Sequence, residues 1–222
     1  MSRSVNILVL FFSIPAFVFV MLVTFDIHIG NQSMADFKYR FHIIFGLSCL
    51  MAFLVALKAT HRWTGIFMVK NPKRFVWSTP VSTERKKNVR LFLVLEIAIA
   101  FFLLLVSNGL SAQAWPLTFV YGITILDQLV YLFIATPLFR VGITQNAVVV
   151  VDRDVKVLYY SGLRKVDLHQ QTIYFDYIEE LQLFFQLNCI PTSEHKNFYN
   201  QLETHVNRDK VFFTERFKTL NS

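Results

Sequence analysis

The chain alternates four long apolar runs with polar connections, and after residue 139 this pattern changes to short β-branched and aromatic segments. The apolar runs are Val5–Phe25, Phe41–Leu57, Leu91–Ser107 and Leu117–Phe139. A helix rises about 1.5 Å per residue, so each run reaches roughly 25 Å or more, close to the hydrocarbon thickness of a bilayer. The pattern predicts an α-helical membrane region with four transmembrane helices over residues 1–138 and a small domain over residues 139–222.

The first apolar run follows Met1-Ser2-Arg3-Ser4, a start that is also typical of a secretory signal peptide. The run is longer than the usual apolar part of such a signal, and it lacks a small-x-small cleavage site near its end. We therefore expect a retained first transmembrane helix.

The loops between the apolar runs differ strongly in charge. Residues 108–116 carry no charge, whereas residues 58–90 contain Glu84 as the only acid and nine bases: Lys58, Arg62, Lys70, Lys73, Arg74, Arg85, Lys86, Lys87 and Arg90. Short positively charged loops stay in the cytoplasm. We expect a multi-pass protein of the cell (inner or plasma) membrane, with the basic loop, the N-terminus and the C-terminus cytoplasmic; Arg3 and Arg140 agree with this orientation.

The basic loop also contains aromatic side chains. Rings at headgroup depth and long cationic side chains that reach phosphate both favour the membrane interface. The interface residues that we expect are Arg62, Trp63, Lys73, Arg74, Trp77, Arg85, Lys86 and Lys87. Specific lipid recognition is one interpretation, and topological anchoring is the one we favour. Pro72 and Pro80 argue against a continuous helix through this loop.

Three polar residues inside the predicted spans are candidates for a functional role. Glu96 is near the cytoplasmic end of the third span, and Asp127 and Gln128 lie near the middle of the fourth. Polar groups at membrane depth are costly, which makes them functional candidates, and either carboxyl group could carry a proton. The simpler interpretation is structural: Lys58 or Arg62 could reach Glu96, and Asp127 could form a hydrogen bond to a neighbouring helix.

Composition narrows the possible functions. The chain is 54% hydrophobic, contains 24 Phe and has a net charge of +7. Because most bases lie beside the predicted spans, the positive charge does not indicate nucleic-acid binding. Cys49 lies in the second run and Cys189 in the tail, so a disulfide between them is not expected. The sequence contains no metal-binding spacing, no cofactor motif and no catalytic motif, and we expect neither cofactor nor metal.

The tail predicts a small antiparallel β domain closed by a helix, an α+β arrangement. The segments with strand character are Val148–Val151, Val155–Tyr160, Val166–His169, Thr172–Tyr177 and Leu181–Phe185. After Pro191, Thr192 or Ser193 can cap a helix. The helix places Phe198, Leu202 and Val206 on one face at a spacing of four, as expected of a helix that packs on a sheet.

This order of segments resembles the YcxB-like C-terminal domain, a compact bacterial pleckstrin-homology-like module. The resemblance rests on the strand segments, on Ile190-Pro191, and on Glu194, Phe198 and Leu202 in the following helix. Tyr159 or Tyr160 stands where that family often has Trp, and no Lys follows Pro191. The resemblance covers about 70 residues of the tail. It implies a pleckstrin-homology-like fold behind membrane helices, with no established catalytic residues.

Two further features of the tail bear on ligands. Arg164, Lys165 and His169 form its one candidate cationic group for a headgroup or partner, although a solvated sheet face is the interpretation we favour. The stretch 210–218 interleaves aromatics and bases, so it could lie on the inner leaflet or pack on the sheet.

Taken together, these features predict a non-enzymatic integral membrane protein with a cytoplasmic binding or regulatory module. We expect it to act through an unidentified protein partner or a homo-oligomer within the lipid bilayer, and not through nucleic acid. The alternative is a small proton-coupled transporter or channel subunit that uses Glu96 and Asp127. A transporter would usually need more spans or internal repeats.

Overall fold

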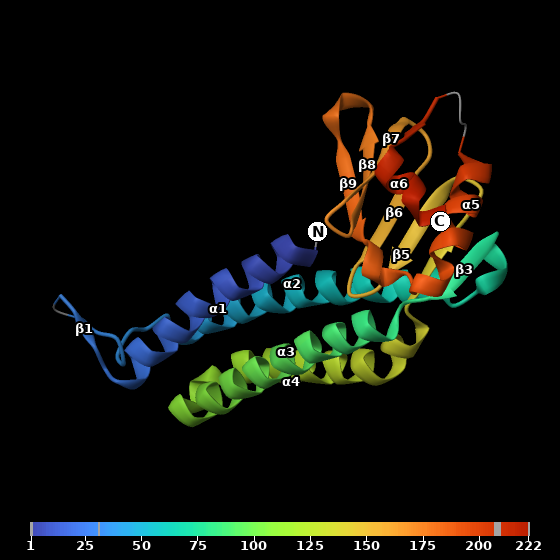
Figure 1. Cartoon of the computed structure of the whole chain (residues 1–222). Coiled ribbons are helices and arrows are strands. Elements are labelled where there is room, and N and C mark those ends of the chain that lie inside the picture. Colours follow the sequence, from blue (N-terminus) through green and yellow to red (C-terminus); the bar gives the residue numbers. More distant parts are fainter. Residues whose placement is uncertain (1, 31, 207–209, 222) are drawn as a thin grey trace. The chain divides into compact units, whose positions relative to one another are not determined.

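The computed structural model describes residues 2–30, 32–206 and 210–221. The chain divides into two compact units (Figure 1). The helix unit comprises Met1–His61 and Phe92–Phe133, and the sheet unit comprises Arg62–Leu91 and Ile134–Ser222. The second and third long helices each contribute residues to both units.

The helix unit is built from four long helices, whose bounds are α1 (Ser2–Thr24), α2 (Arg40–Val69), α3 (Thr83–Leu110) and α4 (Trp115–Val130). A π-helical turn (Tyr131–Ala135) and a 3₁₀ turn (Thr136–Leu138) extend α4. A short hairpin joins α1 to α2, and its strands β1 (His28–Ile29) and β2 (Gln32–Ser33) have two residues each. All four helices are long and apolar enough to cross a membrane, as the sequence predicted.

The four helices pack through one apolar core and are apolar on their outer faces as well. The core contains Ala16, Val20, Ile44, Met51, Ala114, Leu117, Val120 and Tyr121, with Leu103 and Leu104 packed against it. One large ring on the outside of each helix, Phe11, Phe53, Phe102 and Phe133, is between 60% and 73% exposed. Helices that are apolar all round are typical of lipid-facing bundles. Hydroxyl groups within the helices bond back to carbonyls one turn earlier, for example Ser48 to Ile44.

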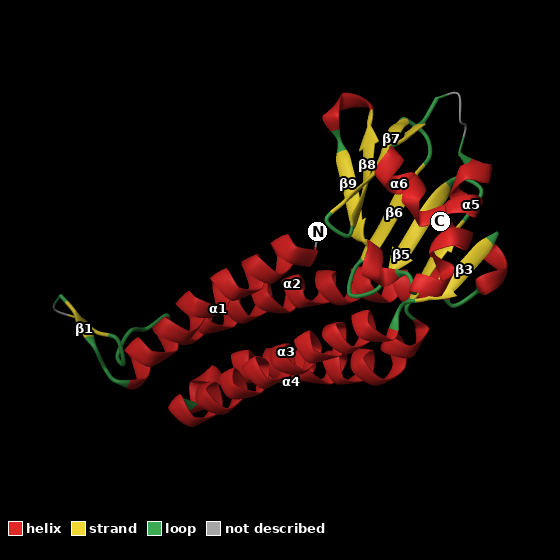
Figure 2. Ribbon diagram, in the orientation of Figure 1, coloured by secondary structure: helices red, strands yellow, loops and turns green. Residues whose placement is uncertain are grey.

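The sheet unit contains two four-stranded sheets (Figure 2). The first has the order β3-β4-β5-β6 and is antiparallel throughout; its strands are β3 (Trp77–Pro80), β4 (Arg140–Ile143), β5 (Ala147–Val151) and β6 (Val155–Tyr159). The second has the order β10-β7-β8-β9, with β7 (Leu163–His169), β8 (Thr172–Tyr177), β9 (Gln182–Gln186) and β10 (Phe212–Phe213). Only the β10–β7 pair is parallel among the described strands.

Two helices complete the sheet unit, α5 (His195–His205) and the one-turn α6 (Glu215–Lys218). Phe198 of α5 lies 6.1 Å from the Phe185 ring of β9 and 5.7 Å from the Trp77 ring of β3. Phe213 and Phe217 pack within 6.3 Å and 5.5 Å of the Tyr199 ring. These aromatic contacts join both sheets to α5 and fix the C-terminal stretch against the unit.

The five strand segments predicted in the tail are present as β5 to β9, and the predicted helix face of Phe198, Leu202 and Val206 is buried. Three strands of the sheet unit, β3, β4 and β10, were not predicted, and neither was the β1–β2 hairpin between α1 and α2. β3 comes from the basic loop and pairs with β4, from Trp77 opposite Ile143 to Pro80 opposite Arg140. The sheet therefore draws one edge strand from between α2 and α3, whereas the sequence placed the whole domain after residue 139.

Candidate functional site

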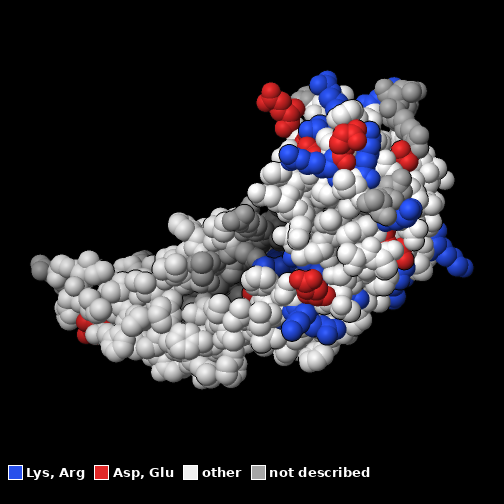
Figure 3. All heavy atoms as spheres, in the orientation of Figure 1, with Lys and Arg blue, Asp and Glu red and all other residues white. Residues whose placement is uncertain are grey.

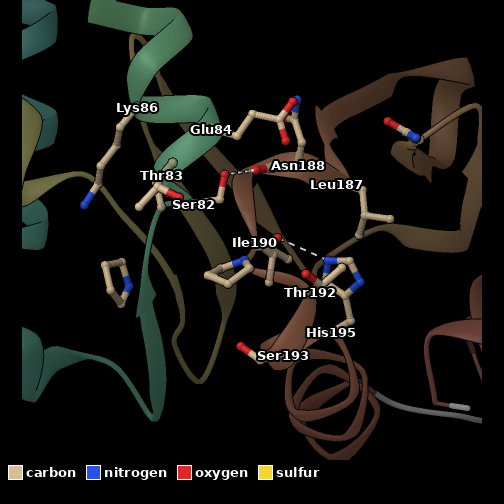
Figure 4. Close-up of a pocket in the computed structure, with 14 residues that line it drawn as sticks. Ser82, Thr83, Glu84, Lys86, Leu187, Asn188, Ile190, Thr192, Ser193 and His195 are labelled. Atoms are coloured by element: carbon tan, nitrogen blue, oxygen red, sulfur yellow. Dashed lines mark hydrogen bonds between the residues drawn. The ribbon is translucent and has the colours of Figure 1, made fainter.

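The sheet unit has a cavity of about 700 Å³ beside the first turn of α3 (Figure 4). This volume is in the range of small-ligand pockets. Ser82, Thr83, Glu84 and Lys86 line one side, and Leu187, Asn188, Ile190, Thr192, Ser193 and His195 line the other. The cavity thus lies between the start of a long helix and the connection from β9 to α5.

Ser82 fixes α3 to this connection. Its hydroxyl donates to the backbone oxygen of Asn188 at 2.6 Å and accepts from the Arg85 amide at 3.1 Å. Its own amide donates to the Cys189 oxygen at 3.2 Å. The hydroxyl that accepts from Arg85 is a helix N-cap. Because the same hydroxyl also donates to Asn188, the helix start and the cavity wall are joined at one residue.

Arg85 adds a second link, to the turn between β5 and β6. Its Nε and Nη2 atoms donate to Asp152 Oδ2 at 2.9 Å and 2.6 Å, and Nη1 donates to Gln186 Oε1 of β9 at 2.9 Å. The Cys189 thiol lies 3.8 Å from the same Asp152 oxygen. Burial, and then the Asp152 charge, raise the pKa of the Cys189 thiol to about 12. The thiol is therefore a neutral, buried group at neutral pH.

The cavity lining mixes polar and apolar side chains, and its described residues include no nucleophile paired with a base. His195 Nε2 lies 3.1 Å from the Ile190 carbonyl oxygen, so this nitrogen carries the proton and donates. The Ser82 hydroxyl donates to a carbonyl rather than to an imidazole. Among the described residues no group of three His, Cys, Asp or Glu side chains could hold a metal ion. The geometry supports binding better than bond-breaking chemistry.

Lys58 and Glu96 form an ion pair within the helix unit. Lys58 Nζ lies 2.9 Å from Glu96 Oε2, and both side chains are mostly buried. The sequence offered Lys58 or Arg62 as the partner of Glu96, and the structure brings Lys58 to it. An opposite charge at this distance stabilises a carboxylate that lies among apolar helices.

Asp127 and Gln128 lie close to the level of this ion pair along the bundle. A Cβ atom on Gly122 of α4 would be 3.8 Å from Leu104 of α3, which sets the register of the two helices. Counting from this contact along antiparallel helices, Asp127 is level with residue 99, about three residues or roughly 4.5 Å short of the level of Glu96. Gln128 is 3% exposed, and its Oε1 atom has no hydrogen bond within the described residues.

The predicted interface residues have different environments. Trp77 packs on Phe198, and Arg85 binds Asp152 and Gln186, so these two side chains have partners inside the sheet unit. The other six are Arg62, which is buried, Trp63 and Lys86, which are half-buried, and Lys73, Arg74 and Lys87, which are exposed. The interface role stays a prediction for all of them.

Within the candidate cationic group of the tail, Lys165 is paired with carboxylates. Lys165 Nζ lies 2.9 Å from Asp167 and 4.0 Å from Asp176, and His169 Nδ1 lies 3.2 Å from Arg216 Nη1. The two carboxylates neutralise Lys165, whereas the contact of His169 is with the Arg216 guanidinium, which is itself positively charged. Arg164 is exposed and belongs to a separate shallow pocket of about 400 Å³ beside Lys210 and Lys218.

Sequence reasoning missed Ser82 and His195. Ser82 stands before Thr83 and Glu84, a typical start of a helix, so its capping role could have been found. No local pattern indicates that it meets Asn188, which is 106 positions away. Comparison with protein-family models, curated proteins and solved structures found no significant match to this chain.

Proposed function

We propose that this protein is a non-enzymatic integral membrane protein whose sheet unit is a cytoplasmic binding module, acting on or through a protein partner. The cavity beside α3 is the observation that carries this proposal. It is large enough for a ligand or for part of a partner chain, and its lining supports binding without supplying a catalytic pair. The resemblance of the tail to the YcxB-like module agrees with a binding role.

The hydrogen bonds and the ion pair around the cavity connect the proposed binding module to α3. Ser82 and Arg85 both lie at the start of α3, and they hold the β9–α5 connection and the β5–β6 turn. A partner that displaces the connection would have to break or move these bonds. The change would therefore reach a helix that is apolar enough to cross the membrane.

The alternative of a proton-coupled carrier receives less support. Glu96 is held by Lys58 at 2.9 Å, and a paired carboxylate is a structural element that needs no transport role. The chain also has four candidate spans, fewer than most secondary transporters. Flux through liposomes that disappears in Glu96→Gln and Asp127→Asn would favour the carrier.

Crosslinking of the full chain in intact membranes tests the binding module. A photoreactive residue at Ser193, in the cavity wall, should capture a defined protein, whereas the same residue at Thr204, which is exposed on α5 away from the cavity lining, should not. Equal capture at both positions, or none at either, would contradict the proposal. Alkaline carbonate extraction and protease added to sealed cells test membrane insertion and the cytoplasmic location separately.

A further inference from the structure

Three basic residues of the sheet unit, Lys86, Arg90 and Arg140, lie close to the ends of two apolar runs of the sequence. Arg90 directly precedes the run Leu91–Ser107, and Arg140 directly follows the run Leu117–Phe139. Lys86 is one helical turn before Arg90, so the two side chains share a face of α3. Arg140 pairs in the sheet with Pro80, which lines the same cavity as Lys86.

None of these three cations is neutralised by a carboxylate among the described residues. Arg90 Nε donates to the Thr136 hydroxyl at 3.3 Å, and Arg140 Nη1 donates to the Ser78 hydroxyl at 2.9 Å. The Lys86 side chain has no hydrogen bond or ion pair within the described part of the chain, although its backbone amide donates to the Ser82 oxygen at 3.0 Å. Glu84 also lines the cavity, but it leaves α3 on the side opposite to Lys86 (Figure 4).

The positive charges are close enough to affect one another. Burial, and then the charges of Arg90 and Arg140, act against the protonated form of Lys86. Like charges held together in this way repel, and an anion that binds among them removes the repulsion. Exposed apolar side chains adjoin the cluster in sequence: Leu91 follows Arg90, and Leu138 precedes Phe139 and Arg140.

We propose that Lys86, Arg90 and Arg140 form a site for the phosphate of an anionic phospholipid, with the acyl chains lying along Leu91 and Leu138. That this phosphate belongs to a lipid rests on the proposed function as an integral membrane protein. Phospholipid phosphates lie just outside the hydrocarbon, at the depth where the two apolar runs end. Guanidinium groups suit phosphate oxygens because they donate in a planar fork, and the Lys86 ammonium adds a further donor.

Thermal unfolding of the full chain in zwitterionic micelles tests this site, with phosphatidylglycerol, phosphatidylcholine or inorganic phosphate added. Phosphatidylglycerol should raise the melting temperature, and phosphatidylcholine should have little effect. Lys86→Gln should raise the lipid concentration for the half-maximal shift about tenfold, because a charge-assisted contact is lost. Lys87→Gln is the control, because it removes the same charge from an exposed neighbour on α3. Its half-maximal lipid concentration should stay within about twofold of that of the native chain.

Lys86→Gln also has an expected effect without lipid. Because Lys86 has no carboxylate partner and faces two other cations, this variant should melt at the same temperature as the native chain or higher. A lower melting temperature without lipid would overturn the proposal, because Lys86 would then stabilise the fold. Lys86→Arg should restore the response to phosphatidylglycerol.

The remaining outcomes separate the sources of the anion. An equal loss in Lys86→Gln and Lys87→Gln would mean diffuse attraction to an anionic surface and would overturn a specific site. Stabilisation by inorganic phosphate at the same concentration as by phosphatidylglycerol would overturn the lipid as the source. If carbonate extraction releases the chain from membranes, the proposed function fails, whereas the effect of Lys86→Gln on phosphate-dependent melting still tests the anion site.

Discussion

Gly65 in α2 is the position where one added methyl group tests the packing of the sheet unit most directly. A Cβ atom there would overlap Cγ2 of Val155 and would lie 3.2 Å from the Val155 Cβ and 3.4 Å from Cγ1 of Val151. Rotation of the valine can move Cγ2, but its Cβ is fixed by the backbone of β6. The Gly65→Ala variant therefore forces α2 and the β5–β6 hairpin apart.

Two effects of opposite sign act in this variant. Alanine is favoured over glycine inside a helix by about 1 kcal/mol, whereas overpacking costs about 1–3 kcal/mol. Gly46 lies in the same helix with nothing within 4 Å of an added Cβ, so Gly46→Ala shows the helix preference without the clash. We expect the free energy of opening of the sheet unit to be about 1–3 kcal/mol lower in Gly65→Ala than in Gly46→Ala.

Cys189 provides a local assay, because its thiol is 1% exposed and becomes reactive only when the sheet unit opens. In a Cys49→Ala background, the labelling rate of Cys189 by a water-soluble maleimide should rise about 5- to 150-fold in Gly65→Ala relative to Gly46→Ala. Adding Val155→Ala to Gly65→Ala removes both Cγ atoms, and the labelling rate should then return most of the way to that of Gly46→Ala. Equal labelling of the two glycine variants, or no recovery with Val155→Ala, would refute the packing argument.

Three further predictions concern charged and buried polar groups. Asp152→Ala leaves the Arg85 guanidinium without its carboxylate and should lower the free energy of unfolding by about 3 kcal/mol, measured by urea titration in micelles. The native Cys189 thiol has a pKa of about 12, whereas the unfolded thiol ionises near pH 9, so stability should fall by about 1 kcal/mol from pH 9 to pH 10, and Cys189→Ala should remove this loss. Glu96→Gln should melt at a lower temperature than the double variant Lys58→Met/Glu96→Leu, because the single change leaves an ammonium without its carboxylate among apolar helices.

The sequence was sufficient to predict the four long helices, because each contains a long apolar run that can be recognised without a pairing partner. Their ends were less predictable. α2 continues twelve residues beyond Leu57 to Val69, and α3 begins eight residues before Leu91, at Thr83. These extensions carry polar and basic residues, so hydropathy alone ends the helices too early. Pro72 and Pro80 correctly indicated a break between them.

Strand β3 shows why part of the sheet could not be predicted. It is four residues long, ends in Pro80 and lies between two membrane-type helices. Its backbone bonds go to β4, about 60 residues later in the chain, so the strand depends on a partner that no local pattern identifies. The strands β5 to β9 were predictable because β-branched and aromatic residues mark each segment, and because hairpins join β5 to β6, β7 to β8 and β8 to β9.

The candidate sites also differ in how far they could be predicted from the sequence. The Lys58–Glu96 pair was predictable, because both residues lie near the same end of adjacent spans and opposite charges at membrane depth need each other. The cavity was not predictable, since Ser82 and His195 come from opposite ends of the sheet unit's sequence. Its polar side chains become a site only when the β9–α5 connection folds against α3.

Positive charge is distributed unevenly between the basic loop and the tail. Residues 58–90 hold nine bases against one acid, whereas residues 139–222 hold ten of each. Charged side chains of both signs lie over the sheet unit on the face in view (Figure 3). Acids of the tail pair with tail bases, as Asp167 does with Lys165, or with Arg85, as Asp152 does. Lys86, Arg90 and Arg140 lie beside the ends of the apolar runs and have no carboxylate partner among the described residues, which is why we propose phosphate binding there.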